Sequence, residues 1–195
     1  IKPDLASLWS GLAKGHKYEI NKAKKNPSFE FTSKADEIYP ELVSLYRDNL
    51  IRVGASEAYY FDDKTLESLL YSDRSISIAA KVDGKIEAIV LSLEINNIAE
   101  YFISATTNLG RSYTRILLWE SISRLKDRGV QLYNLGGGIT KGDSLAMFKQ
   151  RFGAYSLKLK SSKLIFNKEK YHYLSKKFNF DESSLKDYFP PYWKS

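Results

Sequence analysis

The chain has 195 residues, of which 43% are hydrophobic and 27% are charged, as in folded globular proteins rather than disordered ones. It holds no cysteine, which excludes disulfides and thiolate metal sites, and no apolar run long enough to span a membrane as a helix. Thirty Lys and Arg against 23 Asp and Glu give a formal charge of +7. That charge favours polyanionic partners, such as nucleic acid, nucleotide diphosphates or anionic lipid surfaces, although a basic excess that only aids solubility explains it equally well.

The first third of the chain predicts helices with one short strand among them. Apolar residues recur at helical spacing from Leu5 to Ala23, and Asn26-Pro27 should stop that helix. Asp36 is suited to cap a second helix, which should end near Gly54. The expected elements are a helix over 5–25, a strand over 29–31, a helix over 36–54 and a helix with an acidic cap over 62–72.

The middle of the chain predicts an antiparallel meander of three strands. "SISIAAKV" alternates apolar residues at period two, and "IEAIVLSLEI" is apolar on both faces, as a central strand should be. Asp83-Gly84 and Asn96-Asn97 supply the tight turns between the strands. The expected strands are 75–82, 86–95 and 98–107.

The last third predicts a crossover. "SYTRILLWESISRLKDRG" (112–129) is strongly amphipathic, and Gly129 is suited to follow its last turn. "VQLYNL" (130–135) is a strand that runs parallel to its predecessor if the helix crosses over. The remaining expected elements are a short helix over 143–152, a strand or hairpin over 156–166, a helix from Lys168 and an aromatic, Pro-rich tail that covers the sheet edge.

A triple glycine stands between the last strand and the short helix, in "LYNLGGGITKGDSLAMFKQRFG" (132–153). A phosphate-binding loop is excluded, because Lys141 precedes Gly142 and the carboxylate of Asp143 follows it. Contiguous glycines with no further strand–helix unit also exclude a dinucleotide-binding motif. The glycines can simply allow a sharp turn, with Lys149 a solvated lysine of the short helix.

The same segment resembles the strand–glycine–"FK..FG" signature of the Fem-type aminoacyltransferases and the related acetyltransferases of cell-envelope pathways. "HKYEINKAKKN" (16–26) is similar to the basic helix that opens their second lobe, and 110–137 is similar to their long helix and following strand. The resemblance covers roughly residues 5–160. It implies an α/β (α+β), GNAT-like mixed central sheet with helices on both faces. We therefore expect one domain over 1–195, the C-terminal lobe of a longer protein.

The resemblance also implies a function, the transfer of an acyl or aminoacyl group to an amine of a bacterial cell-envelope saccharide or peptidoglycan precursor in the cytoplasm. No metal is expected, and the acceptor is expected to be linked to a nucleotide or a lipid. The residues implied for catalysis are Lys149, Tyr133 and Asn134. Those implied for close approach of the donor or the acceptor are Gly136, Gly137 and Gly138. Those implied for an anionic part of the acceptor are Lys17, Lys22 and Lys25, although an ordinary solvated basic face explains these lysines as well.

The donor stays open between acyl-CoA, such as acetyl-CoA, and aminoacyl-tRNA. "TNLGRS" (107–112) departs from the R/Q-x-x-G-x-G/A loop that CoA-dependent GNAT enzymes carry, because Thr107 stands at the basic position and Ser112 at the second glycine. The amino end of the following helix can still bind an anion. The residues expected to do so are Asn108, Gly110, Arg111, Ser112 and Arg115.

Two other classes of function remain. A nucleic-acid-binding module would use the positive charge together with 3 Trp, 14 Tyr and 10 Phe, although most aromatic residues fall at positions expected in the core. A catalytically inactive lobe would serve only to support a partner lobe. The sole histidines are His16 and His172, and no serine lies in a nucleophile-elbow pattern, which argues against a covalent enzyme intermediate. His16, on the apolar side of its helix, is expected to be a packing residue.

Overall fold

The structure is a computed structural model that describes residues 4–137, 142–158, 160, 162–178, 189 and 190. It divides into two compact units, Ile1–Tyr155 and Ser156–Ser195, which are described separately. The first unit holds the sheet, both hydrophobic cores and every described residue that the sequence assigns to the site. A single domain over 1–195, as the C-terminal lobe of a longer protein, stays a prediction.

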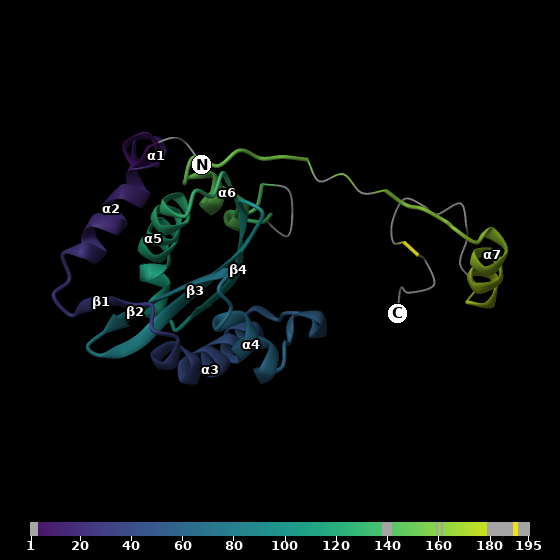
Figure 1. Cartoon of the computed structure of the whole chain (residues 1–195), viewed down its shortest axis with the longest axis horizontal. Helices are drawn as coiled ribbons and strands as arrows, with labels where there is room; N and C mark the ends of the chain where they lie inside the picture. The colour runs from purple at the N-terminus through teal and green to yellow at the C-terminus, as the bar shows by residue number, and fades with distance from the viewer. Residues whose placement is uncertain (1–3, 138–141, 159, 161, 179–188, 191–195) are drawn as a thin grey trace. The chain divides into compact units, whose positions relative to one another are not determined.

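A five-stranded sheet in the order β1-β2-β3-β4-β5 forms the centre of the first unit (Figure 1). Its strands are β1 (Phe29–Thr32), β2 (Ser75–Val82), β3 (Lys85–Ile95), β4 (Ile98–Thr106) and β5 (Leu132–Asn134). The first three neighbouring pairs are antiparallel, and β4 and β5 are parallel. Asp83, Asn96 and Asn97 adopt positive φ in the two hairpin turns. The predicted meander and the crossover to a parallel strand are confirmed.

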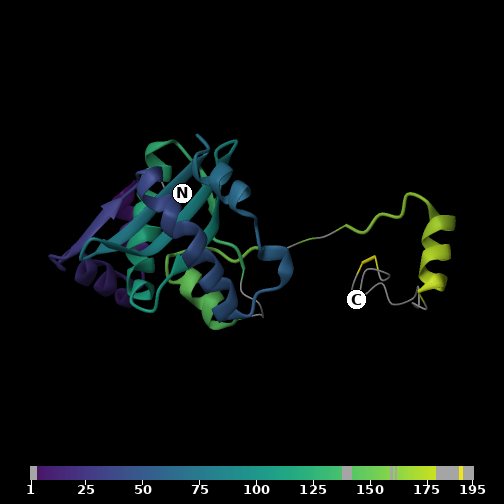
Figure 2. The ribbon, with the colours of Figure 1, turned by 90° about the horizontal axis from the view of Figure 1, so that it is seen from below.

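Helices cover both faces of this sheet, as predicted. On one face lie α1 (Leu5–Gly11), α2 (Lys14–Lys24), α5 (Thr114–Asp127) and α6 (Ser144–Gln150). The 3-10 turn η2 (Gly110–Tyr113) leads into α5. On the other face lie α3 (Ala35–Val53) and α4 (Asp63–Leu70), joined by η1 (Glu57–Tyr59), and Figure 2 shows α3 running across the strands.

Two apolar clusters follow from the alternation of side chains along the strands. Ala88 and Val90 of β3 point toward α5, whereas Ile89 and Leu91 point toward α3 and α4. All four side chains are fully buried. The sheet is therefore a shared middle layer, and β3 is apolar on both faces because both faces are covered.

The amino-terminal helix differs from the prediction. It is broken at Leu12 and Ala13, which are extended, so that α1 and α2 are separate helices. The break buries Leu12 and lets the Ala13 N–H donate to the Arg151 carbonyl, at 2.9 Å. Burial and a long-range hydrogen bond thus outweigh the helical periodicity. Asp36 is not the cap of α3, since Lys34 holds that position and the Asp36 carboxylate accepts from the Tyr71 hydroxyl.

The acidic cap of α4 is confirmed, because the Asp62 carboxylate accepts from the Thr65 N–H at 2.7 Å. Strand β5 is shorter than the predicted 130–135. In the second unit, the expected strand or hairpin over 156–166 is wrong, since its described residues form no strand. The helical start of the tail is confirmed by α7 (Lys168–Lys177). The "YFPPYWKS" end lies outside the described residues except for Phe189 and Pro190.

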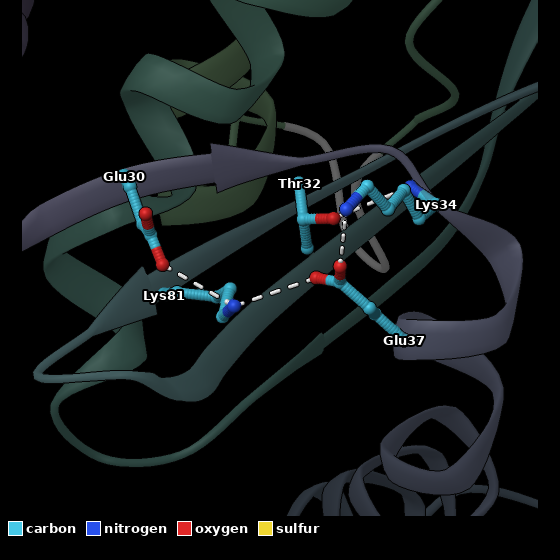
Figure 3. A network of polar contacts seen from close by, with 5 residues as sticks. All are labelled: Glu30, Thr32, Lys34, Glu37 and Lys81. Carbon is cyan, nitrogen blue, oxygen red and sulfur yellow. Dashed lines mark hydrogen bonds and ion pairs between the residues drawn. The ribbon is translucent and has the colours of Figure 1, made fainter.

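A polar network ties the start of α3 to the sheet edge (Figure 3). The Lys81 ammonium on β2 lies 3.2 Å from a Glu30 carboxylate oxygen and 3.4 Å from one of Glu37. Glu37 also pairs with Lys34, at 3.0 Å. Hydrogen bonds from Lys34, and then from Thr32 and Lys81, lower the pKa of Glu37 to about 2. These contacts are exposed to solvent, so they fix the position of α3 more than they add stability.

The described residues show neither a membrane-spanning helix nor a metal-ligand cluster. Among them, no helix combines the length and apolarity needed to cross a bilayer. Within the same residues, no three His, Asp or Glu side chains cluster as metal ligands would.

Candidate active site

Strands β4 and β5 part shortly after they meet. Their pairing covers only Ile98–Leu132, Ala99–Tyr133 and Glu100–Asn134, whereas β4 continues to Thr106. A β-bulge at Phe102 adds to the divergence, because Leu91 of β3 pairs with Ile103 while Ser92 pairs with Tyr101. In the part of the chain that the structure describes, no strand pairs with this edge of β4 beyond Glu100. On that side, the backbone N–H and C=O groups of β4 beyond Glu100 therefore have no ladder partner on a described strand.

A tight glycine turn follows β5. Gly136 has φ of +70°, which disfavours any residue with a side chain. Its N–H donates to the Asn134 side-chain oxygen at 2.9 Å, so Asn134 holds the turn that begins two residues later. A Cβ atom at Gly136 would lie 3.3 Å from the Lys149 ammonium nitrogen. The first glycine is therefore needed both for its conformation and for the close approach of Lys149.

Lys149 is buried, with only 9% of its surface exposed. Its ammonium donates to the Gly137 carbonyl at 2.7 Å, which joins α6 to the glycine turn. Burial lowers the pKa of Lys149, and the nearby Asp143 carboxylate opposes that shift. The interpretation of Lys149 as a solvated helix lysine is therefore wrong. An ammonium has three N–H donors, and the Gly137 carbonyl takes one of them.

Tyr133 points from β5 into the core beneath α5. Its hydroxyl lies 2.6 Å from the Ser92 hydroxyl, and Ser92 is fully buried. Burial raises the pKa of Tyr133, and it raises that of the neighbouring Tyr101 to about 12. Tyr133 therefore stays protonated and can act as a hydrogen-bond donor but not as a base near neutral pH. Its neighbour Asn134 is exposed on the opposite face of the strand.

The predicted donor loop after β4 is held by its own side chains. The Gly110 N–H donates to the Thr107 hydroxyl at 2.9 Å, and the Thr107 N–H donates to the Glu87 carbonyl at 2.9 Å. The Ser112 N–H donates to the Leu109 carbonyl. Two of the amides expected to receive a pyrophosphate are thus already bonded within the turn.

The other predicted residues fall in three places. Arg115 lies with its guanidinium 5.6 Å from the centre of the Phe148 ring, beside the residue that precedes Lys149. Asn108 and Arg111 are exposed, as are Lys22 on α2 and Lys25, which follows the last residue of α2. The Lys17 ammonium donates to the Ser10 carbonyl at 3.0 Å. Gly138 lies outside the described residues. The structure therefore brings together Asn134, Gly136, Gly137 and Lys149, with Arg115 next to them.

Comparison with known proteins gives structural matches only. No model of a known protein family matches the chain, and neither does any curated protein sequence. Among solved structures, FemX superposes with a TM-score of 0.66 at 12% identity, over 78% of this chain and 56% of the FemX chain. This chain therefore spans little more than half the length of FemX.

Two acetyltransferase structures match over nearly their whole length. The aminoglycoside acetyltransferase HMB0005 from an uncultured soil metagenomic sample gives a TM-score of 0.52 at 16% identity, over 71% of this chain and 97% of that one. The PaiA N-acetyltransferase from Thermoplasma acidophilum, solved with coenzyme A, gives a TM-score of 0.52 at 15% identity. The match covers 67% of this chain and 91% of the PaiA chain. The chain has the GNAT fold. At these identities the likeness establishes the GNAT fold alone, and the Fem-type branch stays a prediction.

Two contacts in this part of the sheet are not predicted from the sequence, those of Ser92 and Thr107. The Ser92 hydroxyl shares a hydrogen bond with the Tyr133 hydroxyl, and nothing in its strand pattern marks Ser92 as different from other buried small residues. At Thr107, the resemblance indicates only that a basic residue is absent. The spacing of three between Thr107 and Gly110 is that of a threonine that accepts a backbone N–H at the start of a helix, and this signal was available in the sequence.

Proposed function

We propose that this GNAT-fold chain is an N-acyltransferase that moves an acetyl-type acyl group from acyl-CoA to an amine. The observation that carries the proposal is the buried Lys149 ammonium at the end of β5, beside the point where β4 and β5 part. The GNAT fold supports the reaction class, and the coenzyme A bound to PaiA supports the donor. An aminoacyl group drawn from aminoacyl-tRNA by a Fem-type transferase is the alternative.

The proposed reaction needs positioning and charge stabilisation rather than a covalent enzyme intermediate. A neutral amine attacks the thioester carbonyl, the N–C bond forms, the C–S bond breaks, the amine loses a proton and coenzyme A leaves as its thiol. Negative charge builds on the carbonyl oxygen in the transition state, where a preorganised donor is most effective. Among the described residues Lys149 donates to the Gly137 carbonyl, and its other two N–H donors would serve that oxygen or a donor phosphate. Asn134, exposed beside the glycine turn, would orient the amine, and Tyr133 would support it from the opposite face of β5 through its contact with Ser92.

The donor would enter between the diverging strands, with its acyl group at the unpaired edge of β4. Gly136, Gly137 and Gly138 would allow it to approach the backbone closely. Its phosphates would lie near the amino end of α5, where Asn108, Gly110, Arg111, Ser112 and Arg115 are the proposed contacts. Because the Gly110 and Ser112 amides are used within the turn, the arginine side chains would carry most of the charge recognition.

The acceptor is proposed to be an amino group on a cell-envelope saccharide or peptidoglycan precursor, linked to a nucleotide or a lipid, in the bacterial cytoplasm. Lys22 on α2 and Lys25 at its carboxyl end, both exposed, would face its diphosphate, together with Lys17. A lipid-linked acceptor would bring the chain into peripheral contact with the membrane.

The test is a thiol-release assay with acetyl-CoA and a panel of amino-sugar and peptidyl amines. Because the chain has no cysteine, a thiol reagent reports only the coenzyme A set free. Lys149→Met should lower kcat/KM by about 10²–10³, the usual effect of removing one donor to a developing oxyanion. Lys64→Met is the matched control, since Lys64 is exposed on α4, across the sheet from the site.

The alternatives give different results in the same experiment. Transfer from charged tRNA without any release from acetyl-CoA would establish the aminoacyl donor. Turnover that survives Lys149→Met unchanged would remove the lysine from the mechanism. Failure with both donors would overturn the proposal in favour of an inactive or nucleic-acid-binding lobe, and tight RNA binding without turnover would identify the latter.

A further inference from the structure

Helix α6, which carries Lys149, is attached to α2 by a buried histidine. His16 is 2% exposed, and its Nε2 lies 3.1 Å from the Phe148 carbonyl oxygen. Its ring packs edge-on against Phe152, with centroids 4.5 Å apart, and at an angle against Phe148, at 5.2 Å. A carbonyl can only accept, so Nε2 carries the proton of the neutral ring.

The carbonyl that His16 contacts, that of Phe148, lacks a backbone N–H partner within the last turn of α6. In the last turn, the Met147 carbonyl accepts from the Arg151 N–H. The Lys149 carbonyl accepts from the Phe152 N–H, and the Gln150 carbonyl accepts from the Gly153 N–H. The Phe148 carbonyl would accept from the Phe152 N–H in a continued helix, but that N–H goes to Lys149 instead. His16 therefore caps the carboxyl end of α6 from another helix.

A second bond joins the same two helix ends, since the Ala13 N–H donates to the Arg151 carbonyl. These attachments matter because α6 has only seven residues, too few to be stable as an isolated helix. At its amino end, the Asp143 carboxylate caps it by accepting from the Ala146 N–H at 2.8 Å. At its carboxyl end, the contacts with α2 set its direction.

We propose that His16 is a positioning residue, which holds the Phe148 carbonyl and so keeps the Lys149 ammonium on the Gly137 carbonyl. The chain of contacts is continuous: His16 to Phe148, Phe148 to the next residue Lys149, and Lys149 to the glycine turn. His16 reaches the site only through Lys149, so its importance for catalysis rests on the proposed function. Its effect on the position of Lys149 does not depend on that function.

The experiment measures the accessibility of the Lys149 amine directly. Wild-type protein, His16→Phe and His16→Gln are treated with a limiting amine-acylating reagent, and the modification of each lysine is read by peptide mass spectrometry. Phenylalanine keeps the ring but has no donor, whereas glutamine keeps an N–H donor at nearly the Nε2 position. Exposed Lys64 serves as the internal reference within each sample.

We expect His16→Phe to raise the modification of Lys149 relative to Lys64 by up to about tenfold, the equivalent of one lost hydrogen bond, and His16→Gln to stay close to the wild type. A folded His16→Phe protein with unchanged Lys149 modification would overturn the proposal. If His16→Phe does not fold, His16→Gln decides: wild-type protection of Lys149 supports the proposal, and exposure of Lys149 at an unchanged Tm contradicts it.

Activity then separates this inference from the proposed function. If the chain is an acyltransferase, His16→Phe should lower kcat more than it changes KM for the donor, and His16→Gln should restore kcat. If no acyl donor is accepted, the proposed function fails while the modification pattern still tests the position of Lys149.

Discussion

Two glycine turns follow the two strands that diverge, and they require glycine for different reasons. After β4, a Cβ atom at Gly110 would lie 1.7 Å from the Glu87 carbonyl oxygen, so the residue is needed for close packing of backbone on backbone. After β5, Gly136 is needed for its φ of +70°. The Thr107 hydroxyl holds the first turn, whereas the Asn134 amide oxygen and the Lys149 ammonium hold the second.

The two turns also differ in their surroundings. The contacts of the first turn join it to β3 in the middle of the sheet. The second turn follows the edge strand β5, and its Gly137 carbonyl accepts from the buried Lys149 ammonium. Burial lowers the pKa of this ammonium, against the effect of the Asp143 carboxylate, and ionisable groups with shifted pKa values are common at functional sites.

Replacing the first glycine should have the largest effect. Gly110→Ala drives a methyl group into the Glu87 backbone, which cannot move without disturbing β3, so we expect a loss of about 3 kcal/mol or failure to fold. Gly137→Ala is the matched control, because a Cβ atom there meets nothing within 4 Å. Chemical denaturation of both variants measures the difference. Equal stabilities would mean that the β4 turn does not pack on β3 as described.

Replacing the second glycine should cost less stability but more activity. Gly136→Ala forces alanine into a left-handed conformation, at about 1–2 kcal/mol, and its methyl group crowds the Lys149 ammonium. Under the proposed function, kcat should fall further than this modest destabilisation explains. Denaturation and thiol release on the same preparation measure both quantities. A variant that loses stability but keeps full kcat would show that the turn is only structural.

Removing the hydroxyl of Tyr133 should have a smaller effect. Tyr133→Phe leaves the buried Ser92 hydroxyl without its partner, for a loss of about 1 kcal/mol in the free energy of unfolding. Tyr155→Phe is the control, since that tyrosine is 87% exposed. Thermal unfolding of the two variants compares them. If Tyr133 also orients the amine, the phenylalanine variant should raise KM for the acceptor, an effect that the loss of a purely structural bond would not produce.

The sequence predicts the layered fold well because its strongest patterns are local. A few consecutive residues are enough to predict the two hairpin turns and the apolar faces of β2 and β3. The structure has all of these features. The break at Leu12 and Ala13 was missed because its cause is a hydrogen bond to Arg151. The resemblance predicts a catalytic role for Lys149. Its burial, however, depends on the contact between α6 and the glycine turn. Contacts between distant segments leave no periodic signal.

The pH dependence of stability should show the smallest effect and should report on the helix that carries Lys149. Burial lowers the pKa of His16, and Arg115 and Arg151 add to this because their charges repel an imidazolium. Between the lowered pKa and the ordinary value of about 6.5, the unfolded chain binds a proton that the folded protein does not. Stability should therefore fall as the pH drops below about 6.5.

His16→Gln should remove this slope while leaving stability at neutral pH nearly unchanged. Asp4, Glu37 and Asp62 also lose stabilising charge in acid, but their lowered pKa values move that loss to more acidic conditions. The slope just below neutrality thus belongs to His16 rather than to the carboxylates. Thermal unfolding of wild type and variant across this range measures it. Parallel curves would mean that His16 is already solvated in the folded protein, and the attachment of α6 to α2 would then not depend on a neutral imidazole.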